Sequence, residues 1–366
     1  MKFSANRDDI LSTLQAIIGV VERRQTMPVL SNVLLELDDN QLRMTGTDLE
    51  LELRADTLVH GEASGRTTVP ARKLHDICRG LPDGSELQFQ MDGNRLRVRS
   101  GRSKFLLATL PAEEFPAQDD LDAGRQLALT RQQLSELIQR TQFAMAQQDV
   151  RFYLNGLYFE FADSVIRSVA TDGHRLAMAE VEIAGGNSEK TSIIVPRKGV
   201  TELQRLLGAG SSDLQFNFTD NALQIHLGNI RLTSKLIEGR FPDYERVIPT
   251  QSDKWVTGDR DELRAALQRA AILSNEKFRG VRLLLEDRSL KLQTHNPEHE
   301  EAEEELEVEY VGEKLSIGFN VNYLLDALSA LSTEQYSLGL STPDHSGLLL
   351  EPGNDQCKYV IMPMRL

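Results

Sequence analysis

An internal repeat constrains the fold of this chain more than any other feature of its sequence. Asn32, Gly156 and Gly280 each stand at the start of a similar apolar strand, and they lie 124 residues apart in both intervals (156 − 32 and 280 − 156). Self-similarity at a fixed period is typical of a structural unit that is built several times in one chain. We therefore expect three tandem copies of one unit.

A second set of landmarks repeats with nearly the same period. Val69, Val195 and Phe319 each precede a helical pattern, and they are spaced by 126 and 124 residues (195 − 69 and 319 − 195). Apolar positions at helical spacing predict a first helix in each copy, at residues 8–20, 130–143 and 260–273, and a second helix that begins near Arg72, Arg197 and Val321. Each copy should then run helix, strands, helix, strands.

Alternating residues predict antiparallel, half-buried strands between these helices. Residues 49–53 alternate with period two, and residues 87–98 alternate around Asp92-Gly93, which is typical of a hairpin turn. Helices that pack on antiparallel sheets define the α+β class. We expect three repeats, each with two helices packed on antiparallel sheets, and domains at residues 1–124, 125–253 and 254–366.

The charge balance limits how this chain can hold nucleic acid. The formal net charge is −14, whereas proteins that bind nucleic acid over a broad surface neutralise phosphates with clustered Lys and Arg. Any DNA contact is therefore expected to be local, weak or topological.

The cysteine content and the hydropathy pattern indicate the compartment. Polar residues interrupt the first ten residues, and no run of about 18 apolar residues occurs that could cross a membrane. Cys78 and Cys357 lie in helical and strand patterns without metal-ligand spacing, so reduced core thiols are favoured over a disulfide or a metal site. We expect a cytoplasmic protein.

Several long strings spread over all three repeats resemble the bacterial beta sliding clamps, the beta subunits of DNA polymerase III. They include TGTDLELEL, VPARKLHDICRGLP, QDVRFYLNG, VATDGHRLA, GRFPDYERV, AAILSNEKFRGVRL, NPEHEEAEEEL, IGFNVNYLLDAL and YVIMPMRL. The resemblance implies a DNA-clamp fold in which two chains join head to tail into a ring with twelve helices inside. It also implies a non-catalytic processivity factor without a cofactor or metal.

The resemblance further implies partners and DNA contacts. The partners are duplex DNA, the replicative polymerase, the clamp loader, and other polymerases and repair proteins that carry clamp-binding peptides. Residues that match family positions touching DNA are Arg24, Gln148, Phe152 and Tyr153, and Phe152 replaces the common tyrosine. Basic residues on or beside the helical patterns are candidates for the lining of the ring. Each one taken alone is more often a solvated helix residue, but their recurrence favours the lining: Arg72, Lys73, Arg79, Arg197, Lys198, Arg205, Arg264 and Arg269.

A groove for short linear peptides is implied between the second and third domains. Its apolar members can accept apolar anchors of a peptide, methionines adapt to different partners, and its polar members can bond peptide polar groups. The matching positions are Arg151, Leu154, Thr171, Gly173, His174, Arg175, Leu176, Pro242, Arg246, Val247, Phe278, Asn320, Tyr323, Ser346, Val360, Met362, Pro363, Met364, Arg365 and Leu366.

Ring closure is expected to join the third domain of one chain to the first domain of its partner. The family match nominates Ile272 and Leu273 against Phe105 and Leu107 as the apolar contact. An acidic run that includes Glu298, Glu300, Glu301, Glu303, Glu304 and Glu305 could face the basic residues Arg97, Arg99, Arg102 and Lys104, or it could be a solvated strand or loop.

Two other readings of the chemistry remain open at this stage. Asp172 beside His174 could act as an oriented general base in a hydrolase, and His295 and His299 beside glutamates loosely resemble a metal set. The sequence contains no GxSxG, GxxxxGK[ST] or HExxH motif. A β-rich scaffold without clamp function is the third reading.

Overall fold

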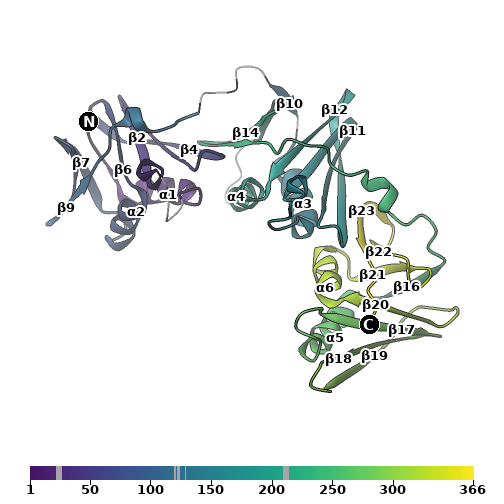
Figure 1. The fold of residues 1–366 in the computed structure, drawn as a ribbon. Helices are drawn as coiled ribbons and strands as arrows, with labels where there is room; N and C mark the ends of the chain where they lie inside the picture. Colours follow the sequence, from purple (N-terminus) through teal and green to yellow (C-terminus); the bar gives the residue numbers. More distant parts are fainter. Residues whose placement is uncertain (22–26, 119–120, 122–123, 128, 209–213) are drawn as a thin grey trace. The chain divides into compact units, whose positions relative to one another are not determined.

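The computed structural model describes residues 1–21, 27–118, 121, 124–127, 129–208 and 214–366, and for residues 184–189 it describes the backbone alone. The chain divides into two compact units (Figure 1). Unit 1 comprises Met1–Arg131 and Lys198–Leu236, and unit 2 comprises Gln132–Arg197 and Ile237–Leu366. Each unit is described by itself below.

The described residues form six α-helices, two in each repeat, as the periodicity predicts. They are α1 (Arg7–Ile17), α2 (Ala71–Gly80), α3 (Arg131–Thr141), α4 (Arg197–Leu207), α5 (Arg260–Ile272) and α6 (Val321–Ala330). The predicted 8–20 helix is wrong at its end, because α1 stops at Ile17. Gly19 and the β-branched Val20 and Val21 follow, and such residues disfavour a further helical turn.

Side-chain caps set the starts of α1, α5 and α6. Asn6, Asp259 and Asn320 each accept a hydrogen bond from a backbone N–H of the first turn of α1, α5 and α6. Such caps satisfy donors that the helix itself leaves without a partner. The predicted order within a repeat needs one correction, since a strand comes before each first helix: β1 (Lys2–Asn6), β10 (Arg125–Leu127) and β16 (Lys254–Asp259).

Unit 1 contains two antiparallel sheets. The five-stranded sheet has the order β5 (His60–Ala63), β1, β7 (Glu86–Asp92), β8 (Arg95–Ser100) and β9 (Ser103–Ala108). The eight-stranded sheet has the order β10, β13 (Leu214–Phe218), β14 (Ala222–Leu227), β15 (Ile230–Lys235), β4 (Leu51–Leu58), β3 (Gln41–Thr47), β2 (Asn32–Asp38) and β6 (Gly65–Pro70).

Unit 2 also contains two antiparallel sheets. The six-stranded sheet has the order β11 (Gly156–Thr171), β12 (Arg175–Pro196), β23 (Asn354–Ile361), β22 (Gly347–Glu351), β21 (Gln335–Leu340) and β16. The four-stranded sheet has the order β19 (Glu301–Glu307), β18 (Ser289–His295), β17 (Gly280–Glu286) and β20 (Leu315–Asn320). In Figure 1 the helices α1 and α2 lie together in unit 1, as α5 and α6 do in unit 2.

Strands from consecutive repeats pair directly, so each large sheet crosses a repeat boundary. β4 of the first repeat pairs with β15 of the second, with Leu53 opposite Leu232. In unit 2, β12 of the second repeat pairs with β23 of the third, with Leu176 opposite Val360. We call these two pairings the first and second seams. They explain why the compact units do not coincide with the sequence repeats.

The alternating strand patterns are confirmed in part. The hairpin in residues 87–98 forms, with Gly93 at a φ of 57° and Asp92 opposite Arg95, so that Gly93 and Asn94 make the turn. The alternation at residues 49–53 predicts that Glu52 faces solvent, and this is wrong, because Glu52 is 1% exposed. Glu52 accepts a hydrogen bond from the Gln118 backbone at 2.8 Å, and its burial raises its pKa.

Both cysteines are free and buried, as the interpretation of reduced core thiols requires. Burial raises the pKa of Cys78 to about 12. None of the helices in the described part of the chain combines the length and the apolar character that crossing a membrane would take.

Candidate functional site

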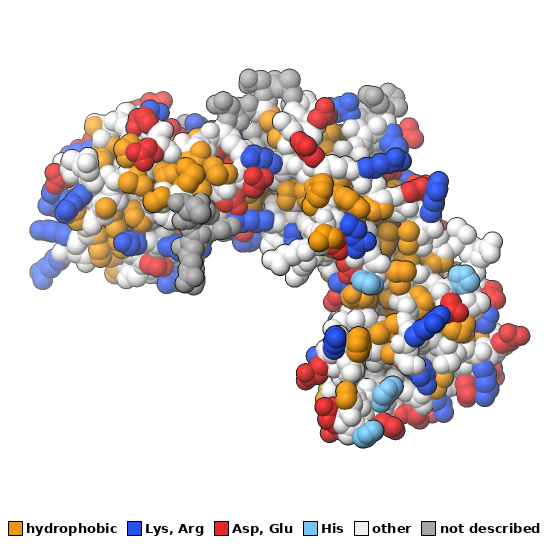
Figure 2. Space-filling model, in the orientation of Figure 1, with side chains coloured by type: hydrophobic (Ala, Val, Ile, Leu, Met, Phe, Trp, Pro, Cys, Tyr) orange, Lys and Arg blue, Asp and Glu red, His pale blue; other side chains and the backbone are white. Residues whose placement is uncertain are grey.

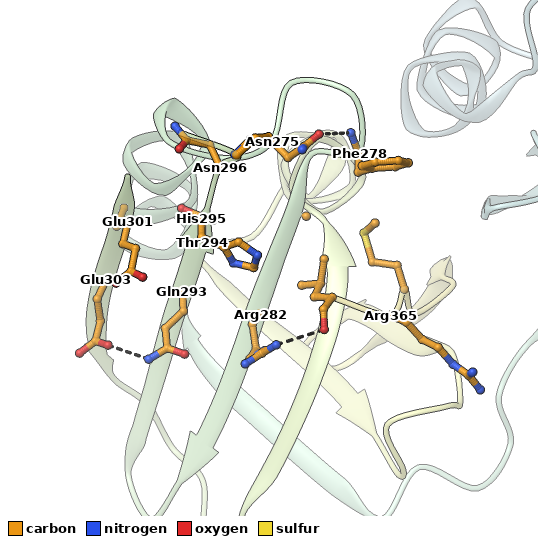
Figure 3. A pocket seen from close by; sticks show the side chains of 15 residues that line it. Asn275, Phe278, Arg282, Gln293, Thr294, His295, Asn296, Glu301, Glu303 and Arg365 are labelled. Carbon is orange, nitrogen blue, oxygen red and sulfur yellow. Dashed lines mark hydrogen bonds between the residues drawn. The ribbon is translucent and has the colours of Figure 1, made fainter. Parts of the chain in front are cut away.

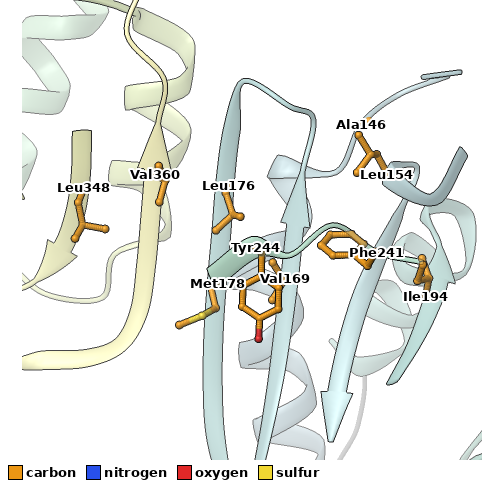
Figure 4. Packing of buried hydrophobic residues seen from close by; sticks show 10 residues of the cluster. All are labelled: Ala146, Leu154, Val169, Leu176, Met178, Ile194, Phe241, Tyr244, Leu348 and Val360. Atoms are coloured by element: carbon orange, nitrogen blue, oxygen red, sulfur yellow. The ribbon is translucent and has the colours of Figure 1, made fainter. Parts of the chain in front are cut away.

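The predicted groove residues all lie in unit 2, where the second seam brings two repeats together. Leu154, Leu176 and Val360 belong to one buried cluster, together with Phe241 and Tyr244 of the segment that follows β15 (Figure 4). Figure 2 shows apolar side chains gathered over this part of unit 2, near η5 (Tyr244–Val247) and β23.

The apolar groove residues divide into a floor and a rim. Leu154, Leu176 and Val360 are almost fully buried, so they form the floor. Val247 and Met362 are each 45% exposed, and Phe278 and Leu366 are 55% and 43% exposed, so these side chains are the ones that an apolar anchor of a peptide can reach. An exposed apolar rim over a packed floor is typical of a peptide-binding groove.

A tight turn at residues 171–175 carries four of the predicted groove residues, Thr171, Gly173, His174 and Arg175. Thr171 Oγ1 donates to the Arg175 carbonyl at 2.6 Å, and Asp172 Oδ1 accepts from the backbone N–H groups of His174 and Arg175 at 2.9 and 3.0 Å. Gly173 has a φ of 88°, a conformation that glycine adopts without strain. The turn holds His174 outward, exposed to solvent.

The first repeat contains a copy of this turn at residues 47–51. Thr47 Oγ1 donates to the Leu51 carbonyl at 3.0 Å, and Asp48 Oδ1 accepts from the backbone N–H groups of Glu50 and Leu51 at 2.9 and 2.7 Å. Leu49 takes the place of Gly173 and has a φ of 80°. The first two repeats therefore share this turn, whereas Thr294 of the third repeat donates to the Ala270 carbonyl instead.

Arg175 holds the turn against helix α6. Its guanidinium contacts the Asp326 carboxylate at 2.5 Å and the Asp172 carboxylate at 3.2 Å, and it donates to the Phe143 carbonyl at 2.8 Å. The same guanidinium lies 4.4 Å from the centre of the Tyr323 ring, an attractive cation–π arrangement. Arg175 therefore positions groove elements, and its donors are largely engaged within the chain.

Arg151 supports the turn from its other side. Its Nη2 donates to the Asp172 carbonyl at 3.3 Å and to the Asp149 carboxylate at 2.8 Å. Bonds from the Arg151 side chain and backbone lower the pKa of Asp149 to about 2. The guanidinium lies within 3 Å of where a side chain on Gly173 would begin, so a side chain there would have to displace the guanidinium.

The C-terminal tail, residues 362–366, carries five more of the predicted groove residues. Met362 N–H donates to the His174 carbonyl at 2.9 Å, and Met364 N–H donates to the Gly318 carbonyl at 2.8 Å. The Leu366 side chain lies against Gly280 and Gly318, where a side chain on either glycine would collide with it. Pro363 and Met364 are half-buried, and Arg365 is exposed.

The remaining predicted groove residues have mixed roles. Asn320 caps α6, and its amide also donates to the Phe278 carbonyl at 3.4 Å. Arg246 is exposed and pairs with Asp243 at 2.7 Å. Pro242 and Phe278 are exposed, whereas Tyr323 and Ser346 are half-buried. The sequence reasoning missed Asp326, because its pairing with Arg175 spans 151 residues.

The candidate DNA loop lies at residues 147–153 of unit 2. Gln148 is exposed with a φ of 55°, Phe152 is exposed, and the Phe152 and Tyr153 rings meet edge to face at 5.9 Å. Val150, which the sequence reasoning missed, is 96% exposed. Arg24 lies outside the described residues.

The basic helix residues differ in their exposure and in the hydrogen bonds and ion pairs that they form within the chain. On α2, Lys73 is exposed, Arg72 donates to the Val21 carbonyl at 2.8 Å, and Arg79 pairs with Asp76 at 3.1 Å. On α4, Arg197 donates to the Met145 carbonyl at 2.9 Å, Lys198 pairs with Asp48, and Arg205 pairs with Glu202 at 2.9 Å. On α5, Arg264 lies 3.8 Å from Asp261, and Arg269 binds both carboxylate oxygens of Glu304.

The predicted closure residues lie on the edge strand β9, at the end of helix α5, and on or just before the edge strand β19. β9 ends the five-stranded sheet of unit 1 and β19 ends the four-stranded sheet of unit 2. Ile272 is 76% exposed, whereas Leu107 is buried and its neighbour Leu106 is 48% exposed. Phe105 and Leu273 are half-buried.

Part of the acidic run is already bonded within the chain. Glu304 pairs with Arg269 at 2.7 Å, Glu303 accepts from the Gln293 amide at 2.7 Å, and Glu300 accepts from the Asn296 amide at 2.7 Å. The Glu298 side chain is exposed.

The geometry around Asp172 and the arrangement of possible metal ligands bear on the hydrolase and metal-site hypotheses. The Asp172 carboxylate is occupied by two backbone N–H groups and by Arg175, as described above. Across the described ranges, no group of three or more His, Cys, Asp or Glu side chains is arranged to hold a metal ion.

Each of the three repeats matches the model of one domain of a single protein family. The model of the DNA polymerase III beta subunit N-terminal domain matches residues 1–119, that of the central domain matches 128–243, and that of the C-terminal domain matches 245–365.

Comparison with individual proteins gives similarity over the full length. The chain is 49% identical to the beta sliding clamp of Pseudomonas aeruginosa and 48% identical to that of Escherichia coli K12, with all of both chains covered in each case. A crystal structure of the Pseudomonas aeruginosa subunit matches with a TM-score of 0.97 at 49% identity, and the Caulobacter crescentus protein matches with a TM-score of 0.95 at 38% identity, again over all of each chain.

Proposed function

Because the chain belongs to the bacterial DNA polymerase III beta subunit family, the beta sliding clamps, we propose that it closes around duplex DNA and tethers the replicative polymerase to it. The protein is a non-catalytic processivity factor. The observation that carries this function is the match of all three repeats to successive domains of one family. We keep 1–124, 125–253 and 254–366 as the proposed domain boundaries.

The ring is a head-to-tail homodimer in this proposal. β9 and β19 are both sheet edges, and an edge offers unpaired backbone groups to another strand. Basic Arg99, Arg102 and Lys104 lie on or beside β9, and acidic residues fill β19, so the two edges have complementary charge. Ile272 supplies an exposed apolar contact beside this edge, and Leu106 joins Phe105 and Leu107 as a candidate on the other side.

Topological retention agrees with the charge of the chain. A ring that holds DNA by enclosure needs few phosphate contacts, and many such contacts would oppose sliding. A net charge of −14 with a few basic residues on helices suits this mode of binding. Contacts of this kind carry no base sequence preference.

Partners dock through the groove of unit 2. The replicative polymerase, the clamp loader, and other polymerases and repair proteins are expected to insert apolar anchors of short peptides at Val247 and Met362, above the floor of Leu154, Leu176 and Val360. A cytoplasmic location, where a bacterial replication protein acts, is part of the proposal.

Retention on circular DNA tests the proposal. Labelled protein is loaded onto nicked circular plasmid with its clamp loader and ATP, free protein is removed by gel filtration, and the DNA is then linearised. Loss of protein only after linearisation is the expected result, because a sliding ring leaves through a free end. Protein that stays on linear DNA would indicate ordinary contact binding, and failure to load with an active loader would contradict the clamp function.

A further inference from the structure

The exposed residues of the groove rim are held in place in different ways. The Met362 N–H bonds the His174 carbonyl, as described above. The Phe278 N–H donates to the side-chain oxygen of Asn275 at 3.0 Å (Figure 3). In the described part of the chain, Val247 forms no hydrogen bond to a residue outside its own 3₁₀ turn, η5. The position of Val247 therefore depends on what holds η5.

The segment that leads to η5 lies against the strands β11 and β12. At its start the Ile237 N–H donates to the Ile194 carbonyl at 2.9 Å. Further along, the Phe241 ring stacks on the Tyr158 ring with centroids 4.6 Å apart. Beyond Ile237, among the residues that the structure describes, no other backbone hydrogen bond joins the segment to a strand as far as the end of η5. Side chains must therefore hold this part of the segment in place.

Tyr244, the first residue of η5, attaches the turn to the sheet. Its ring belongs to the buried cluster that contains the groove floor (Figure 4). Its hydroxyl donates to Glu160 Oε1 on β11 at 3.2 Å. Residues three apart lie in line along a 3₁₀-helix, so Val247 lies on the same side of η5 as Tyr244. The bond to Glu160 therefore fixes the position of both residues.

Glu160 is a buried carboxylate that collects several donors. It is 2% exposed. It accepts from the Tyr158 hydroxyl at 3.3 Å, from the Arg167 guanidinium at 3.3 Å and from the Lys190 ammonium at 2.9 Å. Burial alone would raise its pKa, but Lys190, Tyr244 and Arg167 together hold that pKa below the ordinary value. Because the carboxylate stays charged at neutral pH, its hydrogen bonds are stronger than those between neutral groups.

The corresponding segment of the first repeat is also attached to a buried glutamate. Phe115 and Phe241 are each followed by a proline, and they lie 126 residues apart (241 − 115). Three residues after Phe115, the Gln118 N–H donates to Glu52 at 2.8 Å. Three residues after Phe241 comes Tyr244 with its bond to Glu160. Both repeats therefore attach this segment at the same place, but with different donors.

We propose that Tyr244 and Glu160 are positioning residues of the peptide groove, and that their hydrogen bond holds Val247 where an apolar anchor of a docking peptide meets it. Both side chains are buried, so they act on the peptide through Val247 and do not touch it. The inference rests on the proposed groove, and it adds two residues on which the affinity of that groove depends.

Two substitutions that remove a hydroxyl from the same carboxylate test the proposal in the full-length protein. Tyr244→Phe releases η5, whereas Tyr158→Phe removes a donor that comes from the strand itself. The probe is a labelled five-residue peptide with two leucines and a phenylalanine, followed by fluorescence anisotropy. We expect Tyr244→Phe to weaken binding about threefold to tenfold, as the loss of one hydrogen bond allows. Tyr158→Phe should leave the affinity unchanged.

Amide hydrogen exchange supplies a readout that a general loss of stability would not reproduce. Tyr244→Phe should speed exchange in residues 245–248 more than in the strands, because only the attachment of η5 is lost. Tyr158→Phe should not change exchange in these residues. Urea unfolding checks that both variants are folded.

A second matched pair tests Glu160 itself. Glu160→Gln keeps an oxygen that can accept from the Tyr244 hydroxyl, whereas Glu160→Met has a similar length and offers no such oxygen. The probe is expected to bind more weakly to Glu160→Met than to Glu160→Gln. Equal affinities of these two variants would contradict the role of Glu160.

The outcomes separate this inference from the groove itself. If the unmodified protein binds the probe and Tyr244→Phe binds it equally well, the positioning role is wrong while the groove stands. Equal losses of affinity in Tyr244→Phe and Tyr158→Phe would also overturn the proposal, because they would indicate a general effect of the carboxylate cluster. If the unmodified protein does not bind the probe, the groove assignment fails and this proposal fails with it.

Discussion

Arg175 contacts both repeats that meet at the second seam. It binds Asp172 of its own turn, Asp326 of α6 and the ring of Tyr323, and most of its surface is buried among them. A guanidinium suits this position because its planar fork bonds several acceptors at once while its face stacks on a ring. The groove depends on this side chain for the distance between the turn and the helix.

Substitution of Arg175 is expected to affect stability and peptide binding together. Arg175→Ala leaves Asp326 and Asp172 without their cation and should lower the free energy of unfolding by about 2–3 kcal/mol, measured with urea. Asp326→Asn removes one anchor outside the peptide surface and should weaken peptide binding by a smaller factor. If Asp326→Asn leaves peptide affinity unchanged while Arg175→Ala abolishes it, Arg175 acts by touching the peptide directly.

Two glycines with positive φ provide a matched comparison. Gly173→Ala and Gly84→Ala both force a side chain into the left-handed region, which costs about 1 kcal/mol. A new Cβ at Gly84 meets nothing within 4 Å, whereas at Gly173 it meets the Arg151 guanidinium at 2.9 Å. Calorimetry should therefore show similar losses of stability, while peptide affinity falls only in Gly173→Ala. Equal peptide affinities in the two variants would exclude a role for Arg151 in the groove.

At the level of helices and strands, local periodicity predicted more than long-range pairing did. All six helices were predicted because apolar spacing of 3–4 residues is visible within one segment. The seams were not, since Leu53 and Leu232 show no local sign that they pair. Arg269 was predicted to line the ring and Glu304 to close it, yet the two residues bind each other across 35 positions.

The candidate groove shows the same limit. The family resemblance predicted its residues, but only the structure shows their individual positions. Leu176 is buried in the floor, whereas Met362 is exposed at the rim. Asn320 had a local signal that could have been used, because it stands directly before the helical run that begins at Val321 and caps it. Burial of Glu52 contradicts simple alternation, because its strand is covered on both faces at that position.

Helices α2 and α4 are expected to contribute differently to DNA contact. Lys73 on α2 is exposed, so Lys73→Ala should weaken binding to a short duplex and reduce the slope of log affinity against log salt by about 0.9. Lys198 on α4 pairs with the buried Asp48, so Lys198→Ala should instead lower the free energy of unfolding by about 1–2 kcal/mol. Anisotropy titrations at several salt concentrations check the slopes, and urea unfolding checks the stability. A larger change of slope for Lys198→Ala than for Lys73→Ala would reverse this ranking.

For the whole molecule, the exposed apolar residues at the end of α5 are expected to hold the ring closed. Ile272→Ala with Leu273→Ala should yield monomers in light scattering, because apolar contacts supply most of the affinity of such an interface. Val311→Ala is the control, since Val311 is even more exposed, at 84%, but is not among the proposed interface residues. An unchanged dimer mass in the double variant would rule out this closure surface.

Because strands of neighbouring repeats pair at the seams, a single sequence repeat is not expected to fold by itself. A fragment of residues 1–124 would carry β4 without β15, and a fragment of residues 254–366 would carry β23 without β12. Each would expose a bare row of backbone donors and acceptors, and such rows attract other chains. Single-repeat fragments are therefore expected to associate with other chains, whereas a fragment that keeps both partners of the second seam retains all the candidate groove residues.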